Sequence, residues 1–209
     1  MTRSTGADRL ADELRERVLS GLLPAGAPLR EESIAAEHGL SRHTVRRALE
    51  RLVAERLLVS EPFRGVRVTS FADDDVVALQ QLRVALESEA VRLIRAEHGD
   101  DWPATVLQPL AAAVSRLESA EHVEEAHAAF HRTLVASAGS ARITEAYRQL
   151  DAEMLLFLRQ LSFHYDAHTL CLEHASYLAE VQRTGEQAVR DHLAHATQML
   201  LATRDRPSS

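Results

Sequence analysis

The stretch that decides the fold covers residues 41–52 and reads SRHTVRRALERL. Apolar residues recur in it every three to four positions, which predicts a helix over Arg42–Glu55 with one buried face. That face contains Val45, Ala48, Leu49 and Leu52. Ser41 stands at the expected N-cap, where its hydroxyl can accept a hydrogen bond from an amide of the first turn. The first two turns otherwise carry cationic and polar residues, so this end of the helix should face solvent.

Short helical and strand patterns surround this segment. Upstream, we expect helices over Ala7–Ser20 and Glu31–His38, with the Pro- and Gly-interrupted loop Leu22–Leu29 between them. Downstream, the β-like runs Leu57–Ser60 and Val66–Thr69 flank a turn-rich tip and predict a hairpin. Three helices followed by a two-stranded hairpin is the element order of a winged helix-turn-helix.

The remainder of the chain reads as helix. The patterns cover Val76–His98, Ala104–Ser119, Val123–Ala138, Ala141–His164, Leu170–Thr184 and Glu186–Thr203. We therefore expect a mainly α protein with a winged helix-turn-helix over residues 1–70 and a linker over 71–75. An antiparallel helical bundle should follow over 76–203, and a disordered tail over 204–209.

Composition limits the class of protein. Of 209 residues, 45% are hydrophobic but only 4% aromatic, so the core must consist of Leu, Val and Ala, which favour helices. The single cysteine, Cys171, excludes a disulfide framework. No apolar run approaches the roughly 20 residues of a membrane span, and the first ten residues contain no hydrophobic segment of the signal-peptide kind. We expect a soluble, cytoplasmic protein.

Charge is distributed unevenly along the chain. The formal net charge is −7, yet residues 1–70 hold 12 Arg against 10 acidic residues, whereas residues 71–209 hold 12 against 21. Within residues 40–67 the balance is seven Arg against three Glu. Because only the contacting face must be positive, this basic segment is compatible with binding to DNA phosphates.

The cationic end of the central helix is a candidate DNA-reading surface. A recognition helix enters the major groove by its N-terminal end, where Arg can pair with guanine or phosphate. Two further residues at the hairpin tip suit a close approach to the minor groove or backbone. The candidate contacts are Arg42, His43, Thr44, Arg46, Arg47, Arg64 and Gly65. The alternative is a cationic face that is merely solvated, which is the common fate of isolated charge clusters.

This segment resembles the DNA-binding domain of the GntR family of bacterial regulators. The resemblance covers about Leu10 to Thr69. It rests on Leu23-Pro24-Ala25-Gly26, Leu29-Arg30-Glu31, Ile34-Ala35, Gly39-Leu40-Ser41-Arg42, Val45-Arg46-Arg47-Ala48-Leu49, Leu52 and Arg64-Gly65. It implies that Arg42, Thr44 and Arg46 are the main DNA contacts. Thr44 stands where Pro is common in the family, and Arg47 stands where Glu is usual, so the resemblance does not extend to the exact operator sequence.

Histidines are concentrated in the second half of the chain. His127 and His131 are four residues apart and share one helix face, which allows both to bind one metal ion. His174 lies on a second predicted helix, and His192 and His195 lie on the last. Imidazole-rich sites suit Zn, Ni, Cu or Fe. Each histidine alone is more often a surface or hydrogen-bonded residue.

The helical body resembles the FCD effector domain, the all-helical partner of FadR-type members of the same family. The resemblance rests on Leu82–Glu87, on His127-x-x-Phe130-His131, on Glu173-His174 and on Ala188–His195. It implies an Asp and three His around a divalent metal, with a carboxylate effector completing the site. The metal set is therefore His127, His131, His174 and His195, and Zn or Ni is the expected ion.

Two positions depart from the FCD pattern. His127 occupies the usual Asp position, which predicts either a four-histidine site or a pocket without metal, with Glu124 as a substitute ligand one turn earlier. The spacing from His174 to His195 is about one residue short, which makes His192 a competing ligand. Arg83 is the candidate for binding an effector carboxylate; the alternative is an ion pair with Glu87, four residues later.

These patterns predict a ligand-responsive transcriptional regulator, taken to be a repressor, that binds operator DNA as a homodimer and a small organic acid in its helical body. Two other hypotheses stay open. A His-rich metal site is compatible with a hydrolase, although the sequence contains no HExxH and no GxSxG motif, so we expect no enzymatic activity. A ligand-free architectural DNA-binding protein is the other, and the histidines argue against it.

Overall fold

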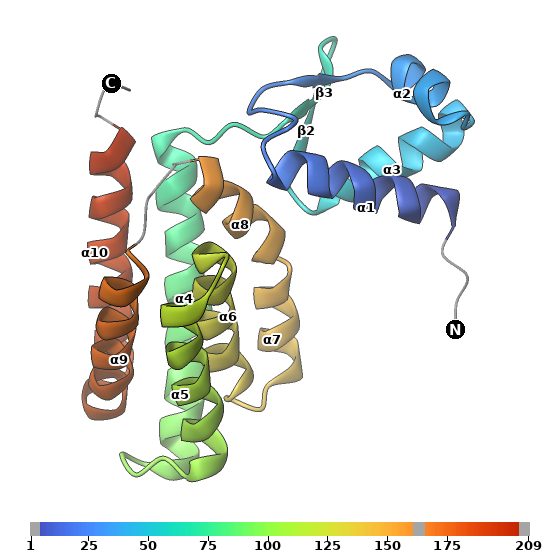
Figure 1. Cartoon of the computed structure of the whole chain (residues 1–209). Helices are drawn as coiled ribbons and strands as arrows, with labels where there is room; N and C mark the ends of the chain where they lie inside the picture. The colour runs from blue at the N-terminus through green and yellow to red at the C-terminus, as the bar shows by residue number, and fades with distance from the viewer. Residues whose placement is uncertain (1–4, 161–165, 205–209) are drawn as a thin grey trace. The chain divides into compact units, whose positions relative to one another are not determined.

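The computed structural model describes residues 5–160 and 166–204 and divides into two compact units. One unit contains the chain up to Phe71 together with Leu155–Gln160, and the other contains Ala72–Met154 and the chain after residue 160. The first holds the small sheet, and the second is helical (Figure 1). The predicted fold class, a winged helix-turn-helix followed by an all-helical domain, is confirmed.

The N-terminal unit is a winged helix-turn-helix. Its elements are α1 (Gly6–Leu19), β1 (Pro28–Leu29), α2 (Glu31–His38), α3 (Arg42–Ala54), β2 (Leu58–Glu61) and β3 (Gly65–Val68). The strands form an antiparallel sheet in the order β1-β3-β2, in which Pro28 pairs with Arg67 and Leu58 pairs with Val68. β1 lies inside the segment that the sequence predicts to be loop, because two paired residues leave no periodic pattern.

Side chains at helical spacing hold α3 in this unit. Its buried residues are Val45, Ala48, Leu49 and Leu52, and it packs against both α1 and α2. The Ser41 hydroxyl accepts a hydrogen bond from the Thr44 amide at 3.1 Å, so the predicted N-cap is present. Gly39, which ends α2 with a φ of 62°, allows the tight turn into α3. The cationic first turns of α3 are thereby held outward on a packed helix.

The second unit is built from helices. They are α4 (Asp73–His98), α5 (Ala104–Ser119), α6 (Val123–Ala136), α7 (Ala141–Arg148), α9 (Ala167–Thr184) and α10 (Glu186–Arg204), together with the start of α8 (Asp151–Gln160), whose residues from Leu155 onward belong to the first unit. α4 packs against α10 and α6, and α5 packs against α6 and α9. Their core includes Ile94, Leu110, Phe130, Leu134 and Leu193. None of the described helices has the length and apolar character needed to cross a membrane.

Two predicted boundaries were wrong. α4 begins at Asp73, so most of the predicted linker 71–75 is the first turn of a helix. Carboxylates are favoured there by the helix dipole, and the Asp75 carboxylate accepts a hydrogen bond from the Ala72 amide at 2.7 Å. The predicted helix Ala141–His164 is two helices, α7 and α8, separated at Gln149–Leu150. Residues 161–164 of that prediction and residues 205–209 of the predicted tail lie outside the described residues.

Candidate DNA interface and metal centre

The first two turns of α3 form the candidate DNA interface. Arg42, His43, Arg46 and Arg47 are exposed there, while Thr44 is half-buried beside the N-cap. Val45, between them in sequence, and Ala48, directly after Arg47, are buried, so the helix separates its cationic face from its packing face. All five predicted contacts on α3 therefore lie in its first two turns.

Acidic residues of α2 hold two of these arginines. Arg46 makes a bidentate ion pair with Glu31, with both nitrogen–oxygen distances at 2.9 Å, and Arg42 pairs with Glu32. The hydrogen bonds from Arg46 lower the pKa of the Glu31 carboxyl. The side chains of Arg42 and Arg46 are nevertheless about 60% exposed (61% and 60%). Each guanidinium is thus held beside a neighbouring carboxylate in an exposed ion pair, which typically contributes little to stability.

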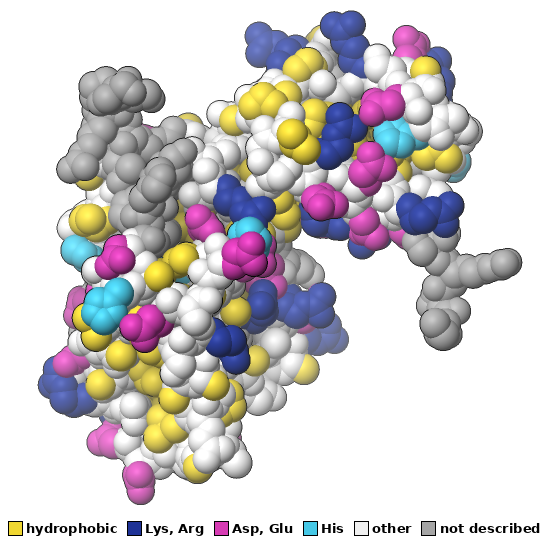
Figure 2. All heavy atoms as spheres, in the orientation of Figure 1, with side chains coloured by type: hydrophobic (Ala, Val, Ile, Leu, Met, Phe, Trp, Pro, Cys, Tyr) yellow, Lys and Arg dark blue, Asp and Glu magenta, His cyan; other side chains and the backbone are white. Residues whose placement is uncertain are grey.

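The hairpin supplies the remaining predicted DNA contacts. Gly65 begins β3 with a φ of 77°, a left-handed conformation that glycine adopts without strain. Arg64, just before it, is exposed and lies 3.5 Å from the Glu61 carboxylate. Figure 2 shows Arg side chains along the edge of the N-terminal unit that carries the hairpin. α3 and the hairpin thus place all seven predicted contacts within one unit.

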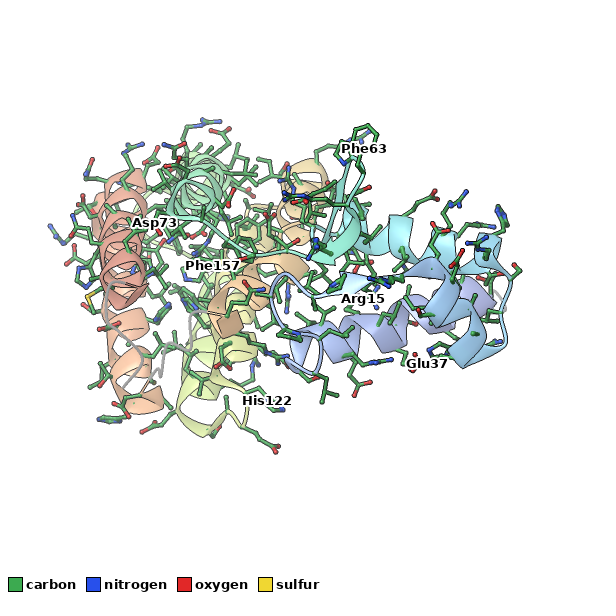
Figure 3. The ribbon with its side chains drawn as sticks, turned by 90° about the horizontal axis from the view of Figure 1, so that it is seen from above. Arg15, Glu37, Phe63, Asp73, His122 and Phe157 are labelled. Carbon is green, nitrogen blue, oxygen red and sulfur yellow. The ribbon has the colours of Figure 1, made fainter. Side chains whose placement is uncertain are left out.

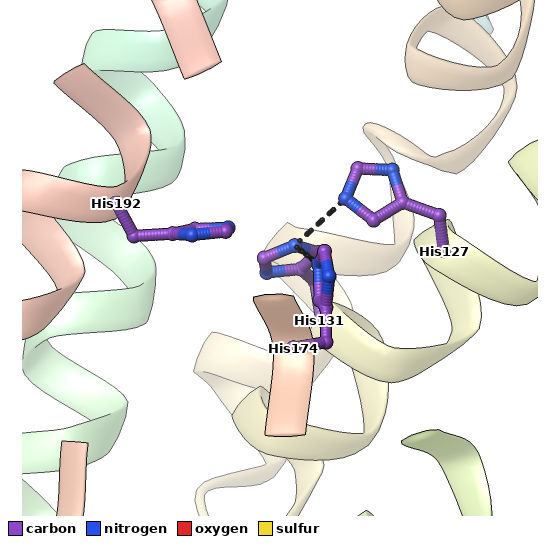
Figure 4. A group of neighbouring side chains, drawn as sticks. All are labelled: His127, His131, His174 and His192. Atoms are coloured by element: carbon purple, nitrogen blue, oxygen red, sulfur yellow. Dashed lines mark hydrogen bonds between the residues drawn. The ribbon is translucent and has the colours of Figure 1, made fainter. Parts of the chain in front are cut away.

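Four histidines converge inside the helical unit. His127 and His131 come from α6, His174 from α9 and His192 from α10 (Figure 4). One ring nitrogen of each lies within 4.8 Å of the others. His131 Nε2 is 3.1 Å from His127 Nε2 and 3.3 Å from His174 Nε2. Nitrogens that share a metal at about 2.0–2.1 Å lie roughly 3.0–3.4 Å apart, so these two separations fit a common ion.

The proton positions of two rings also fit a cation. His174 Nδ1 lies 2.9 Å from the Leu170 carbonyl oxygen, which can only accept, so Nδ1 carries the proton. His131 Nδ1 lies 2.9 Å from the Glu87 carboxylate and donates in the same way. In the neutral rings both Nε2 atoms then carry lone pairs that face each other at 3.3 Å. Two facing acceptors repel unless a cation lies between them.

Burial keeps these rings neutral. His127 and His131 are 7% and 1% exposed, and burial lowers the pKa of each well below its usual range. Burial also lowers the pKa of His174 to about 4 and that of His192 to about 3. Metal ligation requires a neutral imidazole. The cluster is therefore in the protonation state that a divalent ion binds.

Glu87 is a site residue that the sequence analysis named only as a possible partner of Arg83. It is fully buried and accepts hydrogen bonds from Arg83 Nε at 3.0 Å and from the Tyr147 hydroxyl at 2.7 Å. Its other oxygen faces His131. A carboxylate behind a ligating histidine fixes the ring and its tautomer. Arg83 and Glu87 stand four residues apart and therefore share one face of α4. This pair of opposite charges, in a chain that also has a His-rich helix, was the sequence signal that could have identified Glu87 as a site residue.

Arg83 is a buried member of this network rather than a surface residue. It is 3% exposed, and besides Glu87 it contacts the Tyr147 hydroxyl at 3.2 Å and Gln80 Oε1 at 2.9 Å. Burial opposes the charge of Arg83, but its contact with the Tyr147 hydroxyl and the negative charge of Glu87 raise its pKa above the usual value. The ion pair with Glu87 that the sequence offered as the alternative is present, at 3.0 Å, but in the interior.

The last helix contributes His192 to the cluster. The ring of His192 stacks on Tyr177, with 4.0 Å between ring centres and 13° between planes. His195 is exposed and, among the described residues, neither it nor Glu124 belongs to the four-nitrogen group. His192 follows the buried residues Ala188 and Val189 by four and three positions, so the apolar register of α10 favours it over His195.

Two cavities border the histidines. The larger, of about 660 Å³, runs between α9 and α10 and is bordered by His127, His174 and His192. Tyr177 also borders it; this residue is 5% exposed, and its buried hydroxyl has no hydrogen-bond partner among the described residues. The smaller, of about 10 Å³, lies between Arg83, His131 and Tyr147. The larger volume is in the range of small-molecule pockets.

Two protein families match the chain, one for each part. The profile of "Bacterial regulatory proteins, gntR family" matches residues 7–68, and that of the "FCD domain" matches residues 78–198. The two matches leave Thr69–Val77 between them. The first contains α3 and the hairpin, and the second contains all four histidines. Neither family is an enzyme family, so the hydrolase alternative has no support.

Relatives and a solved structure agree with these matches. The chain is 33% identical over 167 residues to the "Probable D-xylose utilization operon transcriptional repressor" of Paenarthrobacter nicotinovorans, covering 78% of this chain and 72% of the relative. It is 27% identical over 208 residues to the gluconate operon transcriptional repressor of Bacillus subtilis, covering 92% and 81%. A structure from Rhodococcus sp. RHA1, described as a GntR transcriptional regulator, superposes with a TM-score of 0.71 and 27% identity, covering 94% and 97%.

Proposed function

Because the chain belongs to the GntR family of bacterial regulators and carries an FCD domain, we propose that it is a repressor whose operator binding responds to a small organic acid. The relatives named above are described as repressors of operons for sugar or sugar-acid use. In this proposal the N-terminal unit reads DNA, and the helical unit binds metal and effector.

Operator recognition is assigned to α3 and the hairpin. Arg42 and Arg46 extend from α3 with their charges held in place by Glu32 and Glu31, while His43, Thr44 and Arg47 offer further contacts on the same turns. Arg64 and Gly65 reach the flanking backbone or minor groove. Two such units in a homodimer would place two recognition helices in successive major grooves of a palindromic site.

Metal binding is assigned to His127, His131, His174 and His192. His195, the ligand that the family resemblance implies, borders the larger cavity and remains available to the effector. Four neutral imidazoles leave the full charge of a divalent ion uncompensated, in contrast to a site with one Asp. A bound ion would supply a coordination position for an anionic effector oxygen. Zn or Ni suits this all-nitrogen donor set.

Effector binding is assigned to the larger cavity. Three of the four clustered histidines border it, and the Tyr177 hydroxyl is a buried polar group there that a ligand can satisfy. Direct contact of the effector carboxylate with Arg83 would require it to reach the small cavity and compete with Glu87 for the guanidinium. We therefore propose that Arg83 marks the deepest point of the effector site.

Regulation requires the effector to bind two conformations of the protein unequally. The coupling free energy is then the same whether measured as the effect of effector on DNA affinity or of DNA on effector affinity. Allosteric couplings in proteins are typically roughly 5- to 150-fold in affinity. We expect an effector to weaken operator binding by a factor of that order.

The proposal rests on the Nε2 atoms of His131 and His174, whose lone pairs face each other in the helical unit. The other unit of the same chain presents the Arg-lined first turns of α3. The test measures binding of the full chain to the DNA fragment upstream of its own gene by fluorescence anisotropy, with and without Zn(II). Gluconate serves as the first effector probe, and an unrelated fragment is the DNA control. Specific binding that a probe weakens only in metal-loaded protein, but not in His174→Ala, supports the proposal. Equal affinity for both fragments would refute it.

A further inference from the structure

The tip of the hairpin carries a fully exposed aromatic side chain. The exposed fraction of Phe63 is 108%, the highest among the large hydrophobic residues described as exposed, and the next is Leu22 at 75%. Figure 3 shows Phe63 at the end of the hairpin, directed away from the rest of the N-terminal unit. No packing in the folded unit accounts for the choice of a phenyl ring at this position.

The backbone at this position is also unfavourable for phenylalanine. Phe63 has a φ of 64°, and the Arg64 amide donates to the Glu61 carbonyl at 3.2 Å across the turn. This makes Phe63 the third residue of a four-residue turn that has Pro62 second, the arrangement of a type II turn. That third position favours Gly or Asn, because other residues are strained at positive φ. Phe63 therefore combines two costs, exposure of its ring and a left-handed backbone.

The hairpin beneath Phe63 is firmly anchored. β3 pairs with β2 on one side and β1 on the other, and Val68 near its end is buried. The Arg67 guanidinium donates to the Gly26 carbonyl at 2.8 Å, which ties β3 to the loop before β1. Such anchoring is what allows a strained, exposed tip residue to persist. The ring is thus presented on a supported tip.

The positive charge around the Phe63 ring favours one class of binding partner. Arg64, the next residue, has a side chain that is 74% exposed, and residues 40–67 hold seven Arg against three Glu. An apolar protein surface would gain little from a ring that stands beside an exposed arginine, whereas a nucleic acid can contact both the arginine and the ring. Its phosphates attract the arginine, and its base steps accept an apolar wedge from the minor groove.

We propose that Phe63 is a DNA-contacting wedge that enters the minor groove beside the operator half-site and presses on one base step. The inference rests on the proposed operator binding by this unit and adds a specificity element to it. Pyrimidine–purine steps unstack most easily, so the wedge should favour a TA or CA step at that position. It would read sequence through deformability, without a hydrogen bond to any base.

The test compares two substitutions at the tip in the full-length protein. Phe63→Gly removes the ring and suits the turn, so its thermal midpoint should equal or exceed that of the wild type. Its operator affinity should fall on the order of tenfold at fixed salt, the scale expected for loss of one buried ring. The slope of log affinity against log salt should not change, because no phosphate contact is lost. Arg64→Ala should instead reduce that slope by about 0.9, one phosphate's share.

Three further measurements complete the test. Phe63→Leu, which keeps an apolar side chain, should retain most of the affinity, and Leu22→Ala should retain all of it as the control for an exposed apolar residue elsewhere. Operator DNA with 2-aminopurine at the step facing the wing should brighten with wild type but not with Phe63→Gly. Equal operator affinity of Phe63→Gly and wild type would overturn the wedge alone. Failure of the wild type to prefer its operator would overturn the proposed DNA recognition as well.

Discussion

Replacing Glu87 by Gln tests whether the buried carboxylate prepares the histidine cluster. The change preserves the shape of the side chain but removes its charge and turns one oxygen into an amide NH₂. In the native chain that carboxylate accepts from Arg83, Tyr147 and His131 at 3.0, 2.7 and 2.9 Å. A glutamine oxygen can still serve Arg83 and Tyr147, so its NH₂ group would face His131 Nδ1. A donor there favours the ring tautomer with its proton on Nε2, toward the metal position.

We expect Glu87→Gln to lower two separate quantities, the affinity for metal and the free energy of unfolding. Loss of a carboxylate behind a ligating histidine weakens metal binding by about 10- to 100-fold, or roughly 1.4–2.7 kcal/mol. Leaving Arg83 buried without its counter-charge also lowers the free energy of unfolding by about 3–5 kcal/mol. The double variant Arg83→Met with Glu87→Gln removes both charges, so most of the stability should return while metal affinity stays low.

The assay is isothermal titration of chelator-stripped protein with Zn(II), accompanied by urea unfolding of each variant. Folded Glu87→Gln that binds Zn(II) as tightly as the wild type would refute the positioning role of Glu87. Recovery of metal affinity in the double variant would equally refute it, because the loss would then follow from the unpaired Arg83 and not from His131.

Three further changes test the interface and the core. Arg46→Ala should weaken operator binding by about 1–3 kcal/mol in anisotropy titrations; unchanged affinity would remove α3 from the interface. Glu31→Gln frees Arg46 from an exposed ion pair worth about 0.2–1 kcal/mol, so operator binding should tighten up to about fivefold, and weaker binding would show that Glu31 orients Arg46 instead. Phe130→Ala should lower the free energy of unfolding by about 3–5 kcal/mol in urea, since Phe130 is fully buried in the helical core; a loss below 1 kcal/mol would show that the core closes around the gap.

Elements with a strong local signal could be predicted from the sequence. α3 and its N-cap follow from the spacing of Val45, Leu49 and Leu52 and from Ser41, because both depend on neighbours within one or two turns. β1 could not be predicted, since two residues become a strand only through pairing with β3, some forty positions later. The division between α7 and α8 was also missed, because apolar residues continue through Gln149–Leu150 without Gly or Pro to mark the break.

The candidate metal centre was predictable where a single helix determines it. His127 and His131 share a face of α6 by their spacing alone, whereas the partner on α10 depends on how that helix is rotated against its neighbours. His192 and His195 differ by only about 60° around a helix, so spacing alone does not separate them. Glu87 could not be placed behind His131 from sequence, since forty-four positions separate the two residues and tertiary packing alone joins them.

Metal stoichiometry in histidine variants shows directly whether the four converging histidines hold an ion. The measurement is the metal content of full-length protein after Zn(II) loading and desalting, for wild type, His174→Ala, His192→Ala and His195→Ala. A four-histidine centre predicts about one Zn per chain in the wild type and in His195→Ala, and strong loss in His174→Ala and His192→Ala. No retained metal in the wild type, or loss in His195→Ala with retention in His192→Ala, would contradict it.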